Sequence, residues 1–228
     1  MSTIADNIAL VSARIRAAEQ AAHRESDSVR LLAVSKTKPA AAVREAFAAG
    51  LRDFGENYLQ EALGKQLELA DLPLSWHFIG PIQSNKTRAI AENFAWVHSV
   101  DRLKIAQRLS EQRPADLPPL NICIQVNVSG EASKSGCTPA DLPALANAIS
   151  ALPRLKLRGL MAIPEPTEDR AAQDAAFGAV QALQASLNLP LDTLSMGMSH
   201  DLESAIAMGA TWVRIGTALF GTRALGHQ

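Results

Sequence analysis

The chain of 228 residues is 47% hydrophobic and 20% charged, and its 22 basic and 23 acidic side chains give a formal net charge of −1. This apolar content is enough for a folded core, which excludes wholesale disorder. The balanced charge argues against a nucleic-acid-binding protein, because such proteins normally carry a basic excess. The length alone allows one large α/β domain or two small ones.

The first two dozen residues predict an amphipathic helix and not a signal peptide. Ile4, Ile8, Val11 and Ile15 recur at helical spacing with charged side chains between them. The longest uncharged stretch, at 175–191, contains glutamines, a serine and an asparagine, so no membrane span is expected. The two cysteines form no CxxC pair, which favours reduced thiols in a cytoplasmic protein.

After this helix, eight short runs rich in β-branched or aromatic residues alternate with longer helical segments. The alternation predicts a parallel sheet, and eight repeats in this length predict a single (β/α)8 barrel of the TIM type. An open doubly wound sheet is the competing fold, because the second and fourth runs are short. The expected strands are 29–35, 53–55, 76–80, 96–100, 121–128, 155–163, 193–196 and 212–216. The expected helices between them are 39–49, 57–70, 85–93, 102–112, 139–152, 168–187 and 201–208.

No linker or low-complexity tract marks a domain boundary. We therefore expect one domain over 1–228, with an extra N-terminal helix at 1–25 and the barrel at 29–221. In a parallel barrel the active site lies at the carboxyl ends of the strands. The residues that directly follow each apolar run are therefore the candidates for function.

A lysine follows the first of these runs. Side chains alternate along a strand, so Leu32, Val34 and Lys36 share one face. If this face points into the barrel, Lys36 emerges at the mouth in apolar surroundings. Desolvation would favour its neutral amine, which can attack a carbonyl and form a Schiff base. The alternative is that Lys36 ends a strand and extends into solvent.

The last two strands end in glycine-containing turns. Ser199 lies in the turn after the seventh run, and we expect Asp201 to be the N-cap of the next helix, which leaves Ser199 free for a ligand. Gly216 and Thr217 follow the eighth run and offer backbone N–H groups. Loops after the last two strands of a barrel commonly bind phosphate, because unpaired amides favour an anion.

A reactive lysine combined with a phosphate site points to a phosphorylated aldehyde or ketone as ligand. Pyridoxal 5′-phosphate (PLP) fits both features. A sugar-phosphate aldolase also fits, and it would form a Schiff base with its substrate without a bound chromophore. No group of His, Cys and Asp residues has metal-ligand spacing, so no metal is expected.

Five segments resemble the YggS/PROSC family of pyridoxal phosphate homeostasis proteins, in the same order over nearly the whole chain. They are LLAVSKTK (31–38), FGENY (54–58), WHFIGPIQSNK (76–86), HSVD (98–101) and SMGMSHD (195–201). The resemblance implies a barrel like the N-terminal domain of alanine racemase, with PLP held as an aldimine on Lys36. It further implies that Arg214 faces the pyridine nitrogen, that Ser199 and the amides of Gly216 and Thr217 bind the phosphate, and that Asn57, His77 and Met161 line the ring pocket.

The arginine opposite the pyridine ring has a chemical consequence. Arginine can only donate hydrogen bonds, so the ring nitrogen would accept one and stay unprotonated. The ring is then a poor electron sink, which disfavours carbanion chemistry on an amino acid. His77, between two aromatic residues, is by composition alone a core histidine rather than a general base.

Two functions remain to be weighed. A PLP carrier would keep the aldehyde masked, whereas a fold-type III amino-acid racemase needs an acid/base group on each face of the cofactor. Racemases of that type add a second domain with a catalytic tyrosine, but only seven residues follow Gly221 here and Tyr58 is the single tyrosine. We therefore expect a non-catalytic, monomeric PLP-binding protein without catalytic residues, with PLP-dependent apo-enzymes as recipients.

Overall fold

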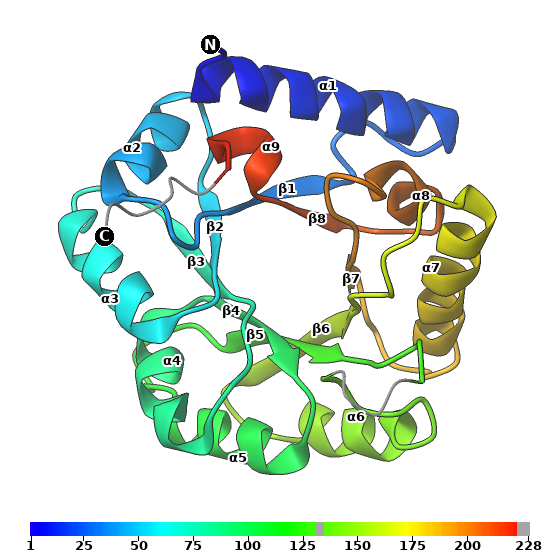
Figure 1. Cartoon of the computed structure of the whole chain (residues 1–228). Helices are drawn as coiled ribbons and strands as arrows, with labels where there is room; N and C mark the ends of the chain where they lie inside the picture. The colour runs from blue at the N-terminus through cyan, green and yellow to red at the C-terminus, as the bar shows by residue number, and fades with distance from the viewer. Residues whose placement is uncertain (131–134, 223–228) are drawn as a thin grey trace.

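The computed structural model describes residues 1–130 and 135–222, and within them eight parallel strands close into a barrel (Figure 1). The strands are β1 (Arg30–Val34), β2 (Asp53–Glu56), β3 (Ser75–Phe78), β4 (Trp96–Val100), β5 (Leu120–Gln125), β6 (Leu155–Met161), β7 (Thr193–Ser195) and β8 (Trp212–Ile215). The helices are α1 (Ile4–Ala21), α2 (Ala40–Ala48), α3 (Leu59–Glu68), α4 (Thr87–Asn93), α5 (Leu103–Gln112), α6 (Leu142–Ser150), α7 (Arg170–Ala185), α8 (Leu202–Ala207) and α9 (Thr217–Phe220), with a 3-10 turn η1 (Ser84–Lys86).

Pairing between the first and last strands closes the sheet. β1 pairs with β2 on one side and with β8 on the other, where Arg30 opposes Trp212 and Ala33 opposes Ile215. The predicted (β/α)8 barrel is therefore confirmed, and the open doubly wound sheet is excluded.

Side-chain alternation along the strands produces two layers of core. Leu32 points into the barrel and joins an interior cluster, whereas Ala33 points outward into the layer between strands and helices. The interior cluster consists of Leu32, Ile79, Trp96, Cys123, Met161 and Trp212. The face predicted for Leu32 and Val34 is thus the inward one, so Lys36 continues toward the mouth.

The extra N-terminal helix α1 packs beside α8 and α9, the helices that follow the last two strands (Figure 1). Its Arg14 forms an ion pair with Glu203 of α8, and Asn7 donates to the carbonyl of Leu219 in α9. Thr3 and Asp6 form a reciprocal capping box that starts α1. Helix α1 therefore supports the segments that carry the expected phosphate site.

Some boundaries differ from the expected ones. The helix expected at 57–70 begins at Leu59, which leaves Asn57 in the loop after β2. The helix expected at 85–93 starts as the 3-10 turn, and α9 was not expected because its four residues are too few for a periodic pattern. Strand β5 ends at Gln125 rather than at 128, and the next residue, Val126, forms an isolated bridge with Cys137.

No helix in the part of the chain that the structure describes is long and apolar enough to cross a membrane.

Candidate functional site

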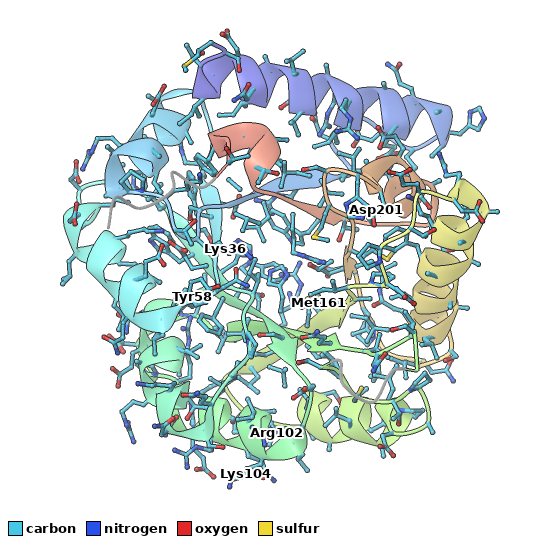
Figure 2. All side chains as sticks on the ribbon, in the orientation of Figure 1. Lys36, Tyr58, Arg102, Lys104, Met161 and Asp201 are labelled. Atoms are coloured by element: carbon cyan, nitrogen blue, oxygen red, sulfur yellow. The ribbon has the colours of Figure 1, made fainter. Side chains whose placement is uncertain are left out.

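A cavity of about 300 Å³ opens at the carboxyl ends of the strands. Six of the eight expected site residues line it: Lys36, Asn57, Ser199, Arg214, Gly216 and Thr217. Val34, Ile79, Ile163, Met198 and His200 complete its wall. Figure 2, drawn along the barrel axis, shows Lys36 within the ring of strands.

A second cavity, of about 560 Å³, lies at the opposite end of the barrel near the starts of β3, β4 and β5. Two charged residues line it, Glu92 and Arg113. Arg113 is used inside the protein, because it donates to the carbonyl oxygens of Ala91, Phe94 and Pro118 at 2.7–2.9 Å, and Glu92 pairs with Arg88 of the same helix at 3.9 Å. The mouth of the barrel remains the better candidate, since it presents ionisable groups from several strand ends.

Lys36 is the residue two positions after the end of β1. Its side chain is partly buried beside Val34 and Ile79, and it makes no hydrogen bond or ion pair with any residue that the structure describes. Thr37 has a left-handed φ of 66°, which turns the chain sharply after the lysine. The amine therefore stands free at the cavity wall on a constrained turn.

Side chains of helix α3 form hydrogen bonds with the backbone on both sides of Lys36. Lys65 Nζ donates to the carbonyl oxygen of Ser35 at 2.6 Å and to Glu56 Oε1 at 2.6 Å, and Glu61 accepts the amide of Thr37. Burial raises the pKa of Glu56, although the hydrogen bond and charge of Lys65 oppose this shift. The turn therefore has two kinds of support: its own hydrogen bond from the Lys38 amide to the Ser35 carbonyl oxygen, and the side chains of α3.

Asn57 reaches the cavity from the loop after β2. Its Oδ1 is buried and has no hydrogen-bond partner within the described residues. The loop lies so close to Gly80 that a Cβ there would come within 2.4 Å of the Asn57 carbonyl oxygen. A buried acceptor without a partner is costly, so this atom is suited to receive a hydrogen bond from a ligand.

The turn after β7 is held by contacts on either side of Ser199. Asp201 precedes α8 as expected, but it makes no side-chain cap; its Oδ1 accepts the amide of Met198 at 2.7 Å instead. The carbonyl oxygen of Ser199 accepts from Arg14 of α1 at 2.8 Å. These two contacts anchor the turn that carries the Ser199 hydroxyl to the cavity.

The segment after β8 brings backbone amides to the same end of the cavity. Gly216 precedes α9, whose first turn leaves N–H groups without partners inside the helix. The absence of a side chain at Gly216 keeps this wall open, next to Val34 of β1. Ser199, Gly216 and Thr217 thus combine a hydroxyl with unobstructed amides, a set that suits an anion.

Arg214 lies on the inner face of β8 and is almost wholly buried. Its Nη1 donates to Ser195 Oγ at 2.8 Å and its Nη2 to the carbonyl oxygen of Ala162 at 3.0 Å. Burial lowers the pKa of the guanidinium to about 10, which still leaves it a cation at neutral pH. The cavity therefore has a fixed cationic donor in its wall.

His77 and Met161 do not line the cavity, contrary to the expectation drawn from the resemblance. Met161 is fully buried in the interior cluster. His77 lies deeper in the barrel, stacked on Trp96 with ring centroids 5.5 Å apart, and bonded to other buried groups. Both side chains belong to the layer beneath the cavity.

Five wall residues were absent from the expected site. Ile79 and Ile163 directly follow the ends of β3 and β6 by one or two positions, so the strand-end criterion could have found them. Met198 and His200 flank Ser199 in the sequence. The polar segment 131–136 contains Lys134, for which the sequence allows a second, transient ligand contact; Lys134 lies outside the described residues.

Comparison with known proteins gives consistent matches. The family described as "Alanine racemase, N-terminal domain" matches residues 7–224. The chain is 79% identical to a pyridoxal phosphate homeostasis protein of Pseudomonas aeruginosa, over 99% of this chain and 98% of that one. It is 53% identical to the protein of the same name from Escherichia coli K12, over 98% of each chain.

Solved structures share the fold. PipY of Synechococcus elongatus PCC7942, in a structure with PLP bound, is 43% identical and superposes with a TM-score of 0.83 over 96% of this chain and all of that one. Alanine racemase from Corynebacterium glutamicum, at 20% identity and a TM-score of 0.67, covers 96% of this chain, which spans 63% of the racemase. That second likeness concerns the barrel fold alone. The chain therefore belongs to the pyridoxal phosphate homeostasis proteins, within the family of the alanine racemase N-terminal domain.

Proposed function

We propose that the protein binds PLP in the cavity at the barrel mouth and serves in PLP homeostasis, holding the cofactor on Lys36 without turning over a substrate. The observation that carries the proposal is that two features share one cavity. Its wall contains the amine of Lys36, which has no partner among the described residues, together with Ser199, Gly216 and Thr217, which offer a hydroxyl and backbone amides. These are the two functional ends of a phosphorylated aldehyde.

The residues present fit PLP. The cavity volume of about 300 Å³ lies at the lower end of the range for small-molecule sites. The buried Oδ1 of Asn57 has no hydrogen-bond partner in the part of the chain that the structure describes, and Ile79 and Ile163 offer apolar surface to a ring. Bound PLP would supply an aldehyde that reacts reversibly with a primary amine, and Lys36 Nζ is the amine this cavity presents.

The remaining residues would orient the cofactor and limit its chemistry. Arg214 can only donate hydrogen bonds, so a ring nitrogen facing it stays an unprotonated acceptor. An unprotonated ring withdraws electrons weakly, which suits storage better than carbanion chemistry. Ser199 and the amides at the start of α9 would bind the phosphate.

The first test compares two neighbouring lysines. Wild-type protein incubated with PLP and reduced with borohydride should carry one covalent adduct on the peptide containing Lys36, and the unreduced complex should be yellow. Lys36→Ala should lose the adduct, whereas Lys38→Ala should keep it, because Lys38 Nζ is engaged with the carbonyl oxygens of Gly221 and Thr222. An adduct that persists at the same level in Lys36→Ala would overturn the assignment.

An amino-acid racemase is the second candidate, and one wall residue bears on it. The ionisable side chains among the described wall residues are Lys36, His200 and Arg214. Two-base racemisation would therefore need His200, which pairs with Asp201 at 3.3 Å, as the second base. Tyr58 is half exposed and does not line the cavity.

Chiral chromatography of L-alanine incubated with PLP-loaded protein separates the two functions. We expect no D-alanine above that formed by free PLP. Formation of D-alanine that disappears in both Lys36→Ala and His200→Ala would establish the racemase and refute the carrier.

We further propose that the protein acts as a cytoplasmic monomer that passes PLP to PLP-dependent apo-enzymes. Cys123 and Cys137 are both free thiols, as is usual in a reducing compartment. The cavity mouth is formed by strand ends of one chain, so a lone copy can bind the cofactor. Light scattering of the purified chain should give about one chain mass, and a dimer mass would refute the monomer.

A further inference from the structure

A line of buried polar side chains crosses the barrel interior beneath the cavity. Arg214 Nη1 lies 2.8 Å from Ser195 Oγ, which in turn lies 2.7 Å from His98 Nδ1. His98 Nε2 lies 2.9 Å from His77 Nδ1, and His77 Nε2 lies 3.0 Å from Asp53 Oδ1. The five residues belong to β8, β7, β4, β3 and β2, and Asp53 begins its strand at the end opposite the mouth. We call these five residues the polar chain.

The chemistry of the two ends determines the direction of every link. Arg214 can only donate, so Ser195 Oγ accepts from it and its own hydrogen is available for His98 Nδ1. The carboxylate of Asp53 can only accept, so His77 Nε2 carries a hydrogen. A neutral imidazole has one donor and one acceptor, so His77 Nδ1 accepts from His98 Nε2. All four bonds are then satisfied with both histidines neutral and in the Nε2–H tautomer.

Burial supports these protonation states. It lowers the pKa of His77, and together with the neighbouring His77 and Arg214 it holds the pKa of His98 well below its ordinary value. Burial opposes ionisation of Asp53, but hydrogen bonding to His77 and the nearby Arg30 bring its pKa below the usual value. Burial also raises the pKa of Cys123 to about 12, so this interior thiol stays uncharged. The polar chain thus runs from a cation to an anion through neutral groups.

Aromatic side chains enclose the middle of the polar chain. The ring of His77 stacks on Trp96 at an interplanar angle of 10° and meets the edge of Trp212 at a centroid distance of 4.9 Å. The guanidinium of Arg30 in turn covers Trp212 and pairs with Asp53 at 3.1 Å. Both imidazoles are fully buried, so a ring that turned would lose its hydrogen-bond partners and would find no water to replace them.

We propose that Asp53, His77, His98 and Ser195 are positioning residues that hold the Arg214 guanidinium in the orientation in which it faces the ring of the bound cofactor. Only Arg214 of the polar chain lines the cavity. Rotating its guanidinium would break the bond to Ser195 and leave the buried groups behind it unpaired. The inference rests on the proposed function, because the cofactor it concerns is PLP.

The first test needs no cofactor. Long-range proton–nitrogen NMR of the whole chain, labelled with ¹⁵N-histidine, reports the tautomer and charge of each imidazole, and the variants described below assign the signals. At about pH 7 we expect His77 and His98 to be neutral with hydrogen on Nε2. A hydrogen on Nδ1 of either residue, or a charged imidazole, would refute the hydrogen-bond directions that we assign to the polar chain.

The second test measures PLP binding with a matched control. Ser195→Ala removes the hydroxyl that Arg214 contacts, whereas Ser110→Ala removes another buried hydroxyl, bonded to the carbonyl of Pro153 and away from the cavity. We expect PLP to bind about tenfold more weakly to Ser195→Ala, with a shifted visible absorption maximum. Ser110→Ala should keep wild-type affinity and spectrum. Equal affinity and spectrum in both variants would refute the positioning role.

A rescue experiment separates orientation from general stability. His98→Leu removes both links of the imidazole, whereas His98→Gln keeps one acceptor and one donor. We expect His98→Leu to bind PLP at least as weakly as Ser195→Ala, and His98→Gln to recover much of the affinity and spectrum. Should His98→Leu fail to fold, Ser195→Ala decides the question. Failure of wild type to bind PLP would refute the proposed function, while the NMR test would still decide the polar chain.

Discussion

At the residue scale, Gly197 shows how one position shapes the end of the cavity that we propose for the phosphate. Its φ of +101° lies in a region that other residues rarely adopt, and an added Cβ would come within 2.6 Å of Ala205 Cβ. Gly50 has a similar φ of +108° but nothing within 4 Å of an added Cβ. Substituting alanine at the two positions therefore distinguishes the effect of backbone strain on stability, present at both, from the effect of a steric clash, present only at Gly197.

We expect Gly197→Ala to lower the free energy of unfolding by about 3 kcal/mol and Gly50→Ala by about 1 kcal/mol, because only the first combines strain with overpacking. Urea denaturation of both variants measures the difference. Gly197→Ala should also weaken PLP binding, since Gly197 leads directly to the turn that carries Ser199. Equal losses of stability in the two variants would contradict this account.

At the element scale, α3 determines the position of the residue that we propose as the cofactor anchor. Lys65 and Glu61 contact the backbone on either side of Lys36, and Lys65 also neutralises the buried Glu56. The helix therefore links the outer layer of the barrel to the cavity. We expect a substitution of Lys65 or Glu61 to alter the position of Lys36 in the cavity, because these side chains hold the backbone beside it.

Lys65→Met should lower the free energy of unfolding by about 3 kcal/mol, because it leaves the carboxylate of Glu56 buried without its partner. Adding Glu56→Gln should recover part of the loss, since the remaining amide is neutral. Lys104→Met, on the exposed face of α5, is the control and should change stability little. Chemical denaturation measures all three, and a loss as small as that of the control would show that the buried pair is dispensable.

At the scale of the whole molecule, the barrel interior makes stability depend on pH. His77 and His98 have lowered pKa values in the folded protein, so the unfolded chain binds more protons below the ordinary histidine pKa of about 6.5. Stability is therefore greatest above this value and is lost as the pH falls below it. The raised pKa of Glu56 acts in the opposite direction above its own ordinary value.

We expect the free energy of unfolding to fall between about pH 7 and pH 5.5, with a slope approaching about 1.4 kcal/mol per pH unit for each neutral histidine. His98→Gln should have a smaller slope, and Glu56 contributes equally to both proteins. Urea denaturation at several pH values checks the comparison. Parallel curves for wild type and His98→Gln would show that folding does not change the protonation of His98, which would contradict its lowered pKa in the folded protein.

The sequence by itself determined the fold and much of the cavity wall. Alternating β and α segments sufficed for the barrel, because period-2 and helical patterns must each bury one face. The strand-end position of Lys36 and the glycine turns before Ser199 and at Gly216 could likewise be read locally. Strand alternation and barrel topology place such residues at the carboxyl ends of the strands, so their position can be predicted even when their contacts are unknown.

The tertiary structure alone decided which polar groups meet inside the barrel. His77 was predicted at the ring pocket, but it lies beneath, bonded to His98 and Asp53. The hydrogen bond from Lys65 to the carbonyl oxygen of Ser35, next to Lys36, could not be predicted from the sequence either. Such pairings depend on strand register and side-chain direction across the barrel, and a pattern within one segment carries no information about the register of another.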